Sequence, residues 1–156
     1  MKKLIILIPL VFICWSFTSG FKSYKLPINW ENDFSIKLYN GGGMYYGSTT
    51  IVFDSAGVVY TKMDHGKVNE EKFKLSENEK IEILKQLKKL KVDNIKTKAT
   101  PGITHDKATT SICFLNKGNA NYCIASSASS EIEEEYKSNF SEAWDYLCGI
   151  VKSKTK

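Results

Sequence analysis

The segment from Phe34 to Met63, FSIKLYNGGGMYYGSTTIVFDSAGVVYTKM, decides the fold. Three runs within it have the alternating or β-branched pattern of strands, and two glycine-containing turns separate them. Gly57 closes the second turn, at a position where a three-residue hairpin loop takes a left-handed residue. The predicted strands are 34–39, 49–53 and 58–63. The segment therefore predicts a three-stranded antiparallel meander.

The clearest helix signal follows the meander. Ser76 and Glu79 have the spacing of a capping box, in which each side chain bonds the backbone N–H of the other residue. Apolar residues then recur at spacings of three and predict one buried stripe, with the intervening lysines largely turned away from it. The stripe consists of Ile81, Leu84, Leu87 and Leu90, and the lysines are Lys80, Lys85, Lys88 and Lys89.

The second half of the chain has the same order of hairpin and helix. Two strand-like runs, 109–115 and 120–125, flank the turn Asn116–Asn119 and predict a second hairpin. Ser130 and Glu133 form a second S-x-x-E pattern, which predicts a capped terminal helix. The apolar face expected for that helix comprises Ile132, Tyr136, Phe140, Trp144, Leu147 and Val151.

This order of elements predicts an α+β domain with an antiparallel sheet of about five strands, in the order βββ-α-ββ-α. We expect both helices to pack on one face of the sheet and the other face to be more polar. The single domain should span residues 34–152. An irregular arm at 21–33, with Trp30 as its anchor, should precede it, and a basic tail at 153–156 should follow.

Four short turn and cap motifs lie between or at the ends of these predicted elements. They are the glycine turn Gly41–Gly43, the D-x-x-G turn Asp54–Gly57, the L-S-x-x-E helix start Leu75–Glu79 and the D-x-x-T-T segment Asp106–Thr110. In these motifs the chain resembles small exported bacterial domains of unknown function. The resemblance extends from about Phe34 to Ile150 and implies the same order of hairpin, helix, hairpin and helix. Since every motif is a turn or a cap, it implies no activity.

The first twenty residues, 1–20, have the pattern of a secretory signal peptide. Two lysines precede an apolar run from Leu4 to Trp15, and small polar residues follow. Thr18 and Gly20 place small side chains beside a cut between Gly20 and Phe21. The run is shorter than the roughly 20 apolar residues that a membrane span needs. We therefore expect an extracytoplasmic protein, periplasmic or secreted, that is cleaved near Gly20.

Cys14 leaves a second possibility for the leader. A cysteine at the end of such a run can become the lipidated first residue of a bacterial lipoprotein, and Val11 suits that pattern whereas bulky Ile13 does not. The alternative interpretation is that Cys14 is one more apolar residue of the leader. Contact with a membrane is expected only if the chain is lipid-anchored through Cys14.

The basic residues argue against nucleic acid as a partner. The formal net charge is +5, and removal of Lys2 and Lys3 with the leader lowers it by two. All 22 basic residues are lysines, so the chain lacks the planar guanidinium on which base and phosphate recognition mostly relies. We interpret the lysines as a solvated surface and expect no nucleic acid partner.

The motifs predict no cofactor and no metal site. The turn Asn40–Gly43 is followed by neither a Lys-Ser/Thr pair nor a helix start, so it does not match a phosphate-binding loop. His65 and His105 each lie beside an aspartate, and close ligand pairs such as H-x-x-x-H or C-x-x-C do not occur. We interpret both histidines as surface residues in polar turns.

Three cysteines, Cys113, Cys123 and Cys148, lie beyond the leader. A disulfide between Cys113 and Cys123 is possible if the loop of the second hairpin holds three residues, because the two cysteines are then directly opposite. A two-residue loop would put them out of register by one. Cys148, at the edge of the last helix's apolar face, could instead reach either strand, and three unbonded thiols are the remaining alternative.

Tyrosines around the glycine turn are the candidate binding residues. Tyr39, Tyr45 and Tyr46 surround Gly42, and tyrosine provides contact area at low entropic cost. The alternative is that they cover the open face of the sheet.

We predict a non-enzymatic exported module that binds an unknown protein or envelope component, for example an exported hydrolase that it inhibits. The other class considered is a small exported hydrolase or thiol enzyme that uses a cysteine with His105.

Overall fold

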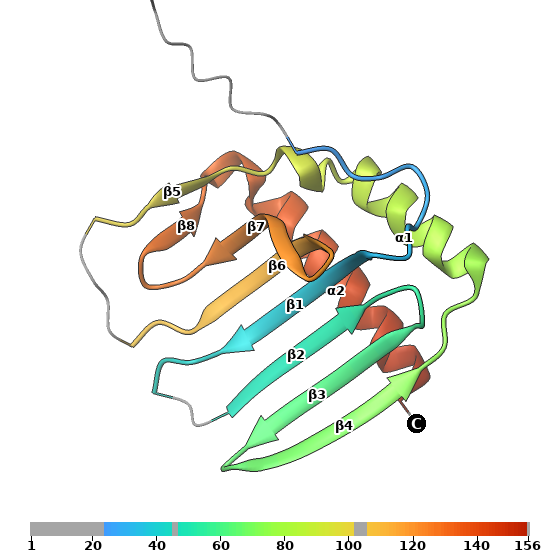
Figure 1. The fold of residues 1–156 in the computed structure, drawn as a ribbon. Helices are drawn as coiled ribbons and strands as arrows, with labels where there is room; N and C mark the ends of the chain where they lie inside the picture. Colours follow the sequence, from blue (N-terminus) through green and yellow to red (C-terminus); the bar gives the residue numbers. More distant parts are fainter. Residues whose placement is uncertain (1–23, 45–46, 102–105, 156) are drawn as a thin grey trace, which may run out of the picture.

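The computed structural model describes residues 24–44, 47–101 and 106–155 (Figure 1). The signal peptide, its cleavage near Gly20 and lipidation of Cys14 lie outside these residues and stay predictions. Tyr45, Tyr46 and His105 lie outside them as well.

A six-stranded antiparallel sheet, with strand order β4-β3-β2-β1-β6-β7, forms the body of the molecule. The strands are β1 (Phe34–Gly41), β2 (Gly47–Phe53), β3 (Val58–Asp64), β4 (Lys67–Phe73), β6 (Thr109–Asn116) and β7 (Asn119–Ser126). The two halves of the chain meet where β1 pairs with β6, from Phe34 opposite Asn116 to Gly41 opposite Thr109. The meander and the second hairpin are therefore parts of one sheet.

Two helices, α1 (Glu77–Lys89) and α2 (Lys137–Lys154), pack on one face of this sheet. In Figure 1, α2 crosses behind the sheet and α1 runs along its upper margin. The shorter elements are η1 (Val92–Asn94), β5 (Thr97–Ala99), β8 (Ser130–Ile132) and η2 (Glu134–Tyr136), and β5 pairs with β8. The predicted α+β class is confirmed. Within the described residues, no helix is long and apolar enough to cross a membrane.

Strand β4 was not indicated by the sequence pattern. Its residues, KVNEEKF, are exposed except for half-buried Phe73. It pairs with β3 from Val58 opposite Phe73 to Asp64 opposite Lys67, and it forms one edge of the sheet. Charged side chains on an edge strand oppose pairing with a further strand. An edge strand of this kind lacks the apolar alternation on which the prediction depended.

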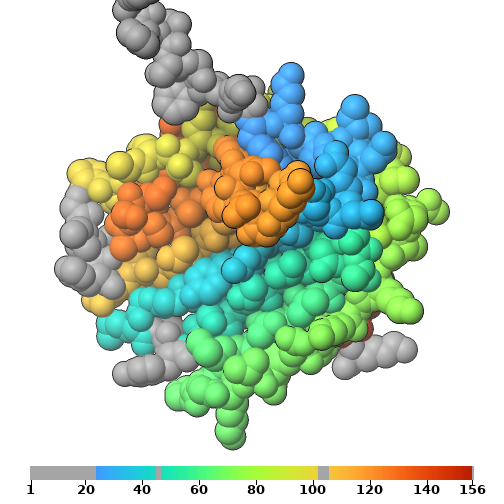
Figure 2. Space-filling model, viewed as in Figure 1, coloured from blue at the N-terminus to red at the C-terminus, as the bar shows by residue number. Residues whose placement is uncertain are grey.

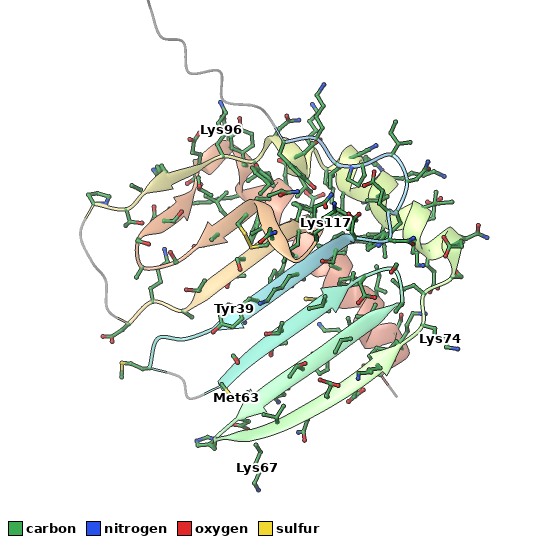
Figure 3. The ribbon with its side chains drawn as sticks, viewed as in Figure 1. Tyr39, Met63, Lys67, Lys74, Lys96 and Lys117 are labelled. Atoms are coloured by element: carbon green, nitrogen blue, oxygen red, sulfur yellow. A yellow bond between two sulfur atoms is a disulfide. The ribbon has the colours of Figure 1, made fainter. Side chains whose placement is uncertain are left out.

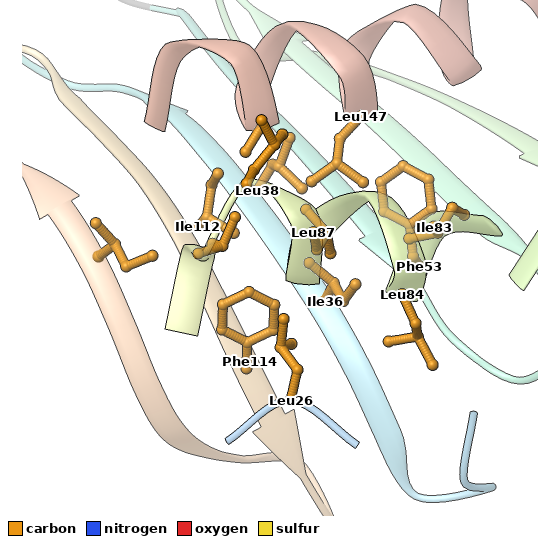
Figure 4. Close-up of a cluster of buried hydrophobic side chains, with 14 of the residues drawn as sticks. Leu26, Ile36, Leu38, Phe53, Ile83, Leu84, Leu87, Ile112, Phe114 and Leu147 are labelled. Atoms are coloured by element: carbon orange, nitrogen blue, oxygen red, sulfur yellow. The ribbon is translucent and has the colours of Figure 1, made fainter. Parts of the chain in front are cut away.

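The core lies between the sheet and the two helices (Figure 4). Leu38 from the central strand β1, Leu87 from α1 and Leu147 from α2 have no exposed surface. Alternate residues of neighbouring strands extend this layer, including Ile36, Ile51, Phe53, Ile112 and Phe114. Because burying one side chain of this size stabilises by about 1.5–3 kcal/mol, this layer is the main source of stability.

One of the two predicted capping boxes is present. The Ser76 N–H donates to the Glu79 carboxylate at 2.7 Å, and the Glu79 N–H donates to the Ser76 hydroxyl at 3.3 Å. The second prediction is wrong, because Ser130 lies in β8 and α2 begins after Tyr136, whose side chain makes no capping bond. Pairing of β8 with β5 supplies backbone partners to the residues that the S-x-x-E pattern assigned to a helix start.

The buried stripe of α1 is rotated relative to the prediction. Ile81 is 41% exposed, and the buried side chains are Lys80, Ile83, Leu84 and Leu87. Lys80 lies on the inner side because its ammonium donates to the Ser55 carbonyl at 2.6 Å and to the Glu77 carboxylate at 2.8 Å. The lysine thereby connects α1 to the β2–β3 turn.

Residues 24–33 contain neither helix nor strand and pack against one end of the sheet. Tyr24 stacks on Phe114 and Tyr122, with ring centroids 5.4 and 5.1 Å apart. Trp30 meets Phe34 edge to face at 5.2 Å. We call this end of the sheet, where the arm and the β2–β3 and β6–β7 turns lie, the arm end.

Candidate binding surfaces

Three segments meet at the opposite end of the sheet, which we call the loop end. They are residues 41–44 of the β1–β2 turn, residues 63–68 around the β3–β4 turn, and residues 106–108 before β6. A hollow of about 420 Å³ lies among them, and its lining includes Gly42, Met63 and Ala108. Gly42, one of the predicted binding residues, therefore lines this hollow.

Gly43 holds the glycine turn against the segment before β6. Its φ is +68°, and a Cβ atom there would lie 2.7 Å from the Asp106 carbonyl oxygen and 3.1 Å from the Ala108 nitrogen. Gly42 has a φ of +84°, but a Cβ atom there would meet no other atom within 4 Å. Both positions favour glycine for their backbone conformation, and Gly43 also requires it for close approach.

Large apolar side chains are exposed together at the loop end. The exposed fraction is 75% for Met44, 61% for Val68 and 41% for Met63. Met63 and Val68 are directly opposite on β3 and β4, and Figure 3 shows Met63 at this end of the sheet. The other exposed large hydrophobic residues, Ile28 and Ile81, lie singly in the arm and on α1. A group of exposed apolar side chains, unlike a single one, marks a contact surface.

His65 lies in the tight turn between β3 and β4. Its φ of +47° and the +79° of Gly66 are typical of a two-residue hairpin turn of type I′. The imidazole Nδ1 lies 2.5 Å from the Asp64 carboxylate, and both side chains are exposed. The hollow beside them has no cysteine in its lining. The geometry of His65 is that of a solvated surface turn.

The face of the sheet turned away from the helices is a second candidate surface, which we call the open face. Figures 1 and 2 view the molecule from this side, and the β6–β7 turn stands in front of one margin of the face. Tyr39 lies on it directly opposite Ser111, and Lys37 lies opposite Cys113. A shallow hollow of about 390 Å³ is lined by these four residues together with Leu115 and Ala120.

Tyr39 connects the open face with the loop end. A Cβ atom on Gly41 would lie 3.0 Å from the Tyr39 hydroxyl oxygen, so the phenol ring extends along the sheet toward the glycine turn. Figure 3 shows this side chain lying across the sheet. The structure thus places Tyr39 and Gly42 on two adjoining surfaces, whereas the sequence grouped them around one turn.

The disulfide Cys113–Cys123 joins β6 and β7 on the open face, with an S–S distance of 2.10 Å. The turn between the strands holds two residues, Lys117 and Gly118, and not the three on which the predicted register depended. A bulge at Asn121 adds one residue to β7, so Cys113 and Cys123 are nevertheless directly opposite. The pairing is confirmed, although the loop length assumed for it is wrong.

Cys148 is the free cysteine of the described residues. It lines a groove of about 410 Å³ between α2 and the sheet, together with Trp144 and Tyr60. Burial raises the pKa of its thiol, which favours the protonated form. A cysteine nucleophile instead needs a lowered pKa and a partner base, and His105, the predicted base, lies outside the described residues.

Within residues 24–44, 47–101 and 106–155, no group of three or more His, Cys, Asp or Glu side chains is arranged to hold a metal ion. Comparison of the chain with models of protein families finds no match, and comparisons with curated proteins and with solved structures find no significant match. Functional interpretation therefore depends on the loop end and the open face themselves.

Sequence reasoning missed most of the residues that form these two surfaces. Met63 and Val68 become neighbours only through β4, which had no apolar alternation. Lys37 and Ser111 are distant in sequence and meet through the β1–β6 pairing. Alternation in each strand could have placed both on the same side of a sheet, but the strand order was needed to bring them together.

Proposed function

We propose that the protein is an exported, non-enzymatic binding module whose partner is a protein or another component of the cell envelope. The loop end is its main contact surface. The observation that carries this proposal is the exposure of Met44, Met63 and Val68 at one end of the sheet, where a hollow of about 420 Å³ also lies. Apolar groups that remain exposed in the folded chain gain free energy when a partner covers them.

The cysteine chemistry supports binding over the thiol-enzyme alternative. Cys113 and Cys123 are joined to each other, which removes two of the three candidate nucleophiles outside the leader. Burial raises the pKa of the third thiol, Cys148, away from the reactive thiolate form. A disulfide also suits the oxidising compartment to which the predicted leader would direct the chain.

Loss of partner recovery from a loop-end variant tests the binding role. The variant combines Met44→Ser, Met63→Thr and Val68→Thr, which remove apolar surface. Serine suits the turn that holds Met44, and threonine suits strands β3 and β4. A matched control combines Ile28→Ser and Ile81→Ser, which remove exposed apolar surface elsewhere. We expect envelope components captured by the unmodified protein to be captured by the control and lost from the loop-end variant, with quantification by mass spectrometry.

Equal recovery with both variants would exclude the loop end as the contact surface. Export is tested separately by the mass of the mature N-terminus. A chain beginning at Phe21 supports cleavage after Gly20, whereas an acylated Cys14 indicates the lipid-anchored form. An intact leader on protein from the cytosol would contradict both.

A further inference from the structure

We propose that the open face docks a partner protein that presents one carboxylate to Lys37. This inference rests on the proposed binding function and specifies the chemistry of the partner. It concerns the part of the open face around Lys37, whereas Met63 and Val68 lie at the loop-end margin of the same face. The Tyr39 side chain extends from the first region toward the second.

The open face carries much less charge than the chain as a whole. The strand registers place alternate residues of β1, β2, β3, β6 and β7 on this face, and Lys37 is the charged residue among them. By contrast, 25% of the full sequence is charged. On β4, Glu70 and Lys72 share the face but form an ion pair with each other at 3.0 Å. Depletion of charge is characteristic of the central part of a protein interface.

Lys37 lies beside two hydroxyl groups that point to a specific ligand chemistry. Tyr39 and Ser111 line the same hollow, and Ser111 is only 9% exposed. Among the described residues, neither hydroxyl has a side-chain hydrogen-bond partner, and Lys37 has no ion-pair partner. An ammonium and two hydroxyls can all donate to a carboxylate, which accepts through both of its oxygens.

The area of the face suits a protein partner. Six strands about 4.8 Å apart, each with about seven residues at a rise of about 3.4 Å, cover on the order of 700 Å². A typical specific interface buries about 800 Å² on each partner. Neutral side chains of moderate size occupy most of this area, including Thr50, Val52, Val59, Thr61, Leu115 and Ala125.

The position of Lys37 favours an acidic partner over a second copy of the chain. Lys37 lies on β1, one of the two central strands, so face-to-face packing of two copies would bring two ammonium groups close together. A polyanion is recognised by a cluster of cations, whereas this face presents one unpaired lysine. The formal net charge is +5 for the full chain and +5 − 2 = +3 without Lys2 and Lys3 of the leader, and this positive charge further attracts an acidic partner and repels a second copy.

A matched pair of peptides tests the inference by NMR titration of the ¹⁵N-labelled protein. The probes are acetyl-TVEVT-amide and acetyl-TVQVT-amide, which differ only in whether the central side chain is a carboxylate or an amide. We expect amide shifts at Lys37, Tyr39 and Ser111, and about three- to fivefold tighter binding of the glutamate peptide, as for a solvent-accessible ion pair. High salt should remove this difference.

Two protein variants complete the test. Lys37→Gln should abolish the preference for glutamate, whereas Lys96→Gln, which removes an exposed lysine at the top of the view in Figure 3, should retain it. Equal affinity for the two peptides, a preference that survives Lys37→Gln, or the absence of shifts on the open face would each overturn the inference. None of these results affects the loop-end capture experiment, so the proposed function and this inference can fail separately.

Discussion

The arm end and the loop end of the sheet are built from similar short turns but are held in different ways. At the arm end, the Ser55 hydroxyl donates to the Asn32 carbonyl at 3.3 Å, and the Lys117 N–H donates to the Asp33 carbonyl at 3.0 Å. The arm thus bonds both hairpin turns beside it. At the loop end, Met44 is exposed in the β1–β2 turn and exposed Met63 lines a hollow.

The two ends of the sheet therefore differ in what they contribute: the arm end contributes to folding stability, and the loop end leaves apolar side chains exposed. At the arm end, aromatic rings stack on Phe114, which has no exposed surface. At the loop end, apolar groups remain available for contact with another molecule. Changes at the arm end should therefore alter mainly the free energy of unfolding, and changes at the loop end mainly binding.

The largest expected effect is that of Phe114→Ala. Removing this fully buried ring at the arm end should lower the free energy of unfolding by about 3–5 kcal/mol. Met63→Thr at the loop end should change it by less than about 0.5 kcal/mol, because the side chain is already exposed. Urea unfolding followed by tryptophan fluorescence measures both values. Similar losses in the two variants would contradict the separation.

Removal of the disulfide should have the next largest effect. The double variant Cys113→Ser, Cys123→Ser should lose about 2–3 kcal/mol, since the bridge restricts the unfolded chain across a sequence separation of 10. Cys148→Ser is the control, because it removes a half-buried thiol that bridges nothing. Thermal unfolding of the three proteins provides the comparison, and an equal loss in the control would argue against a stabilising bridge.

Gly42 and Gly43 allow a comparison of two neighbouring positions within the loop end. Gly43→Ala should cost about 2 kcal/mol, because it combines a left-handed backbone with a clash against the Asp106 carbonyl. Gly42→Ala should cost about 1 kcal/mol, because its surroundings are open and only the backbone conformation is unfavourable. Equal losses in the free energy of unfolding, measured with urea, would mean that the close approach of Gly43 to Asp106 does not contribute to stability.

A further small effect, at the level of the Gly42 substitution, concerns Glu79 at the start of α1. Hydrogen bonds from Lys154 and then from Ser76 lower the pKa of its carboxyl from 4.5 to about 2. The ionised form is favoured in the folded state, so this stabilisation is present above pH 4.5 and is lost as the pH falls toward 2. Glu79→Gln should cost only about 1 kcal/mol at neutral pH, since the group is partly exposed and screened.

Unfolding measured across this acidic range tests the assignment. The difference between Glu79→Gln and the unmodified protein should shrink as the pH falls from 4.5 to 2. Glu82→Gln is a suitable control, because Glu82 pairs with Lys85 on the exposed side of the same helix and takes no part in the cap. A constant difference for Glu79→Gln would mean that its carboxyl does not titrate in this range.

The sequence was most informative where side chains interact with near neighbours. The meander, the second hairpin and the Ser76–Glu79 cap depend on alternation, turns and a three-residue spacing. The prediction of the second cap failed because Ser130 lies in β8, whose backbone pairs with β5, a segment distant in sequence. Lys80 is buried and Ile81 exposed, the reverse of the prediction, because the Ser55 carbonyl in the β2–β3 turn accepts a hydrogen bond from the lysine.

The candidate surfaces were less predictable for the same reason. Tyr39 and Gly42 could be selected because they lie near each other in sequence. The hollow around Lys37 and the apolar group of Met63 and Val68 depend on strand pairs, and one of those strands has no apolar pattern. Prediction from the sequence therefore identified a turn, whereas the surfaces extend over several strands.

The bulge at Asn121 sets the alignment of β7 on β6. Without it, β7 from Tyr122 onward would slide by one position, which would turn the Ile124 side chain into water and the Cys123 sulfur into the interior. The oxidised bridge is compatible only with the bulged alignment. The bridge therefore secures the register in which Ile124 faces the core.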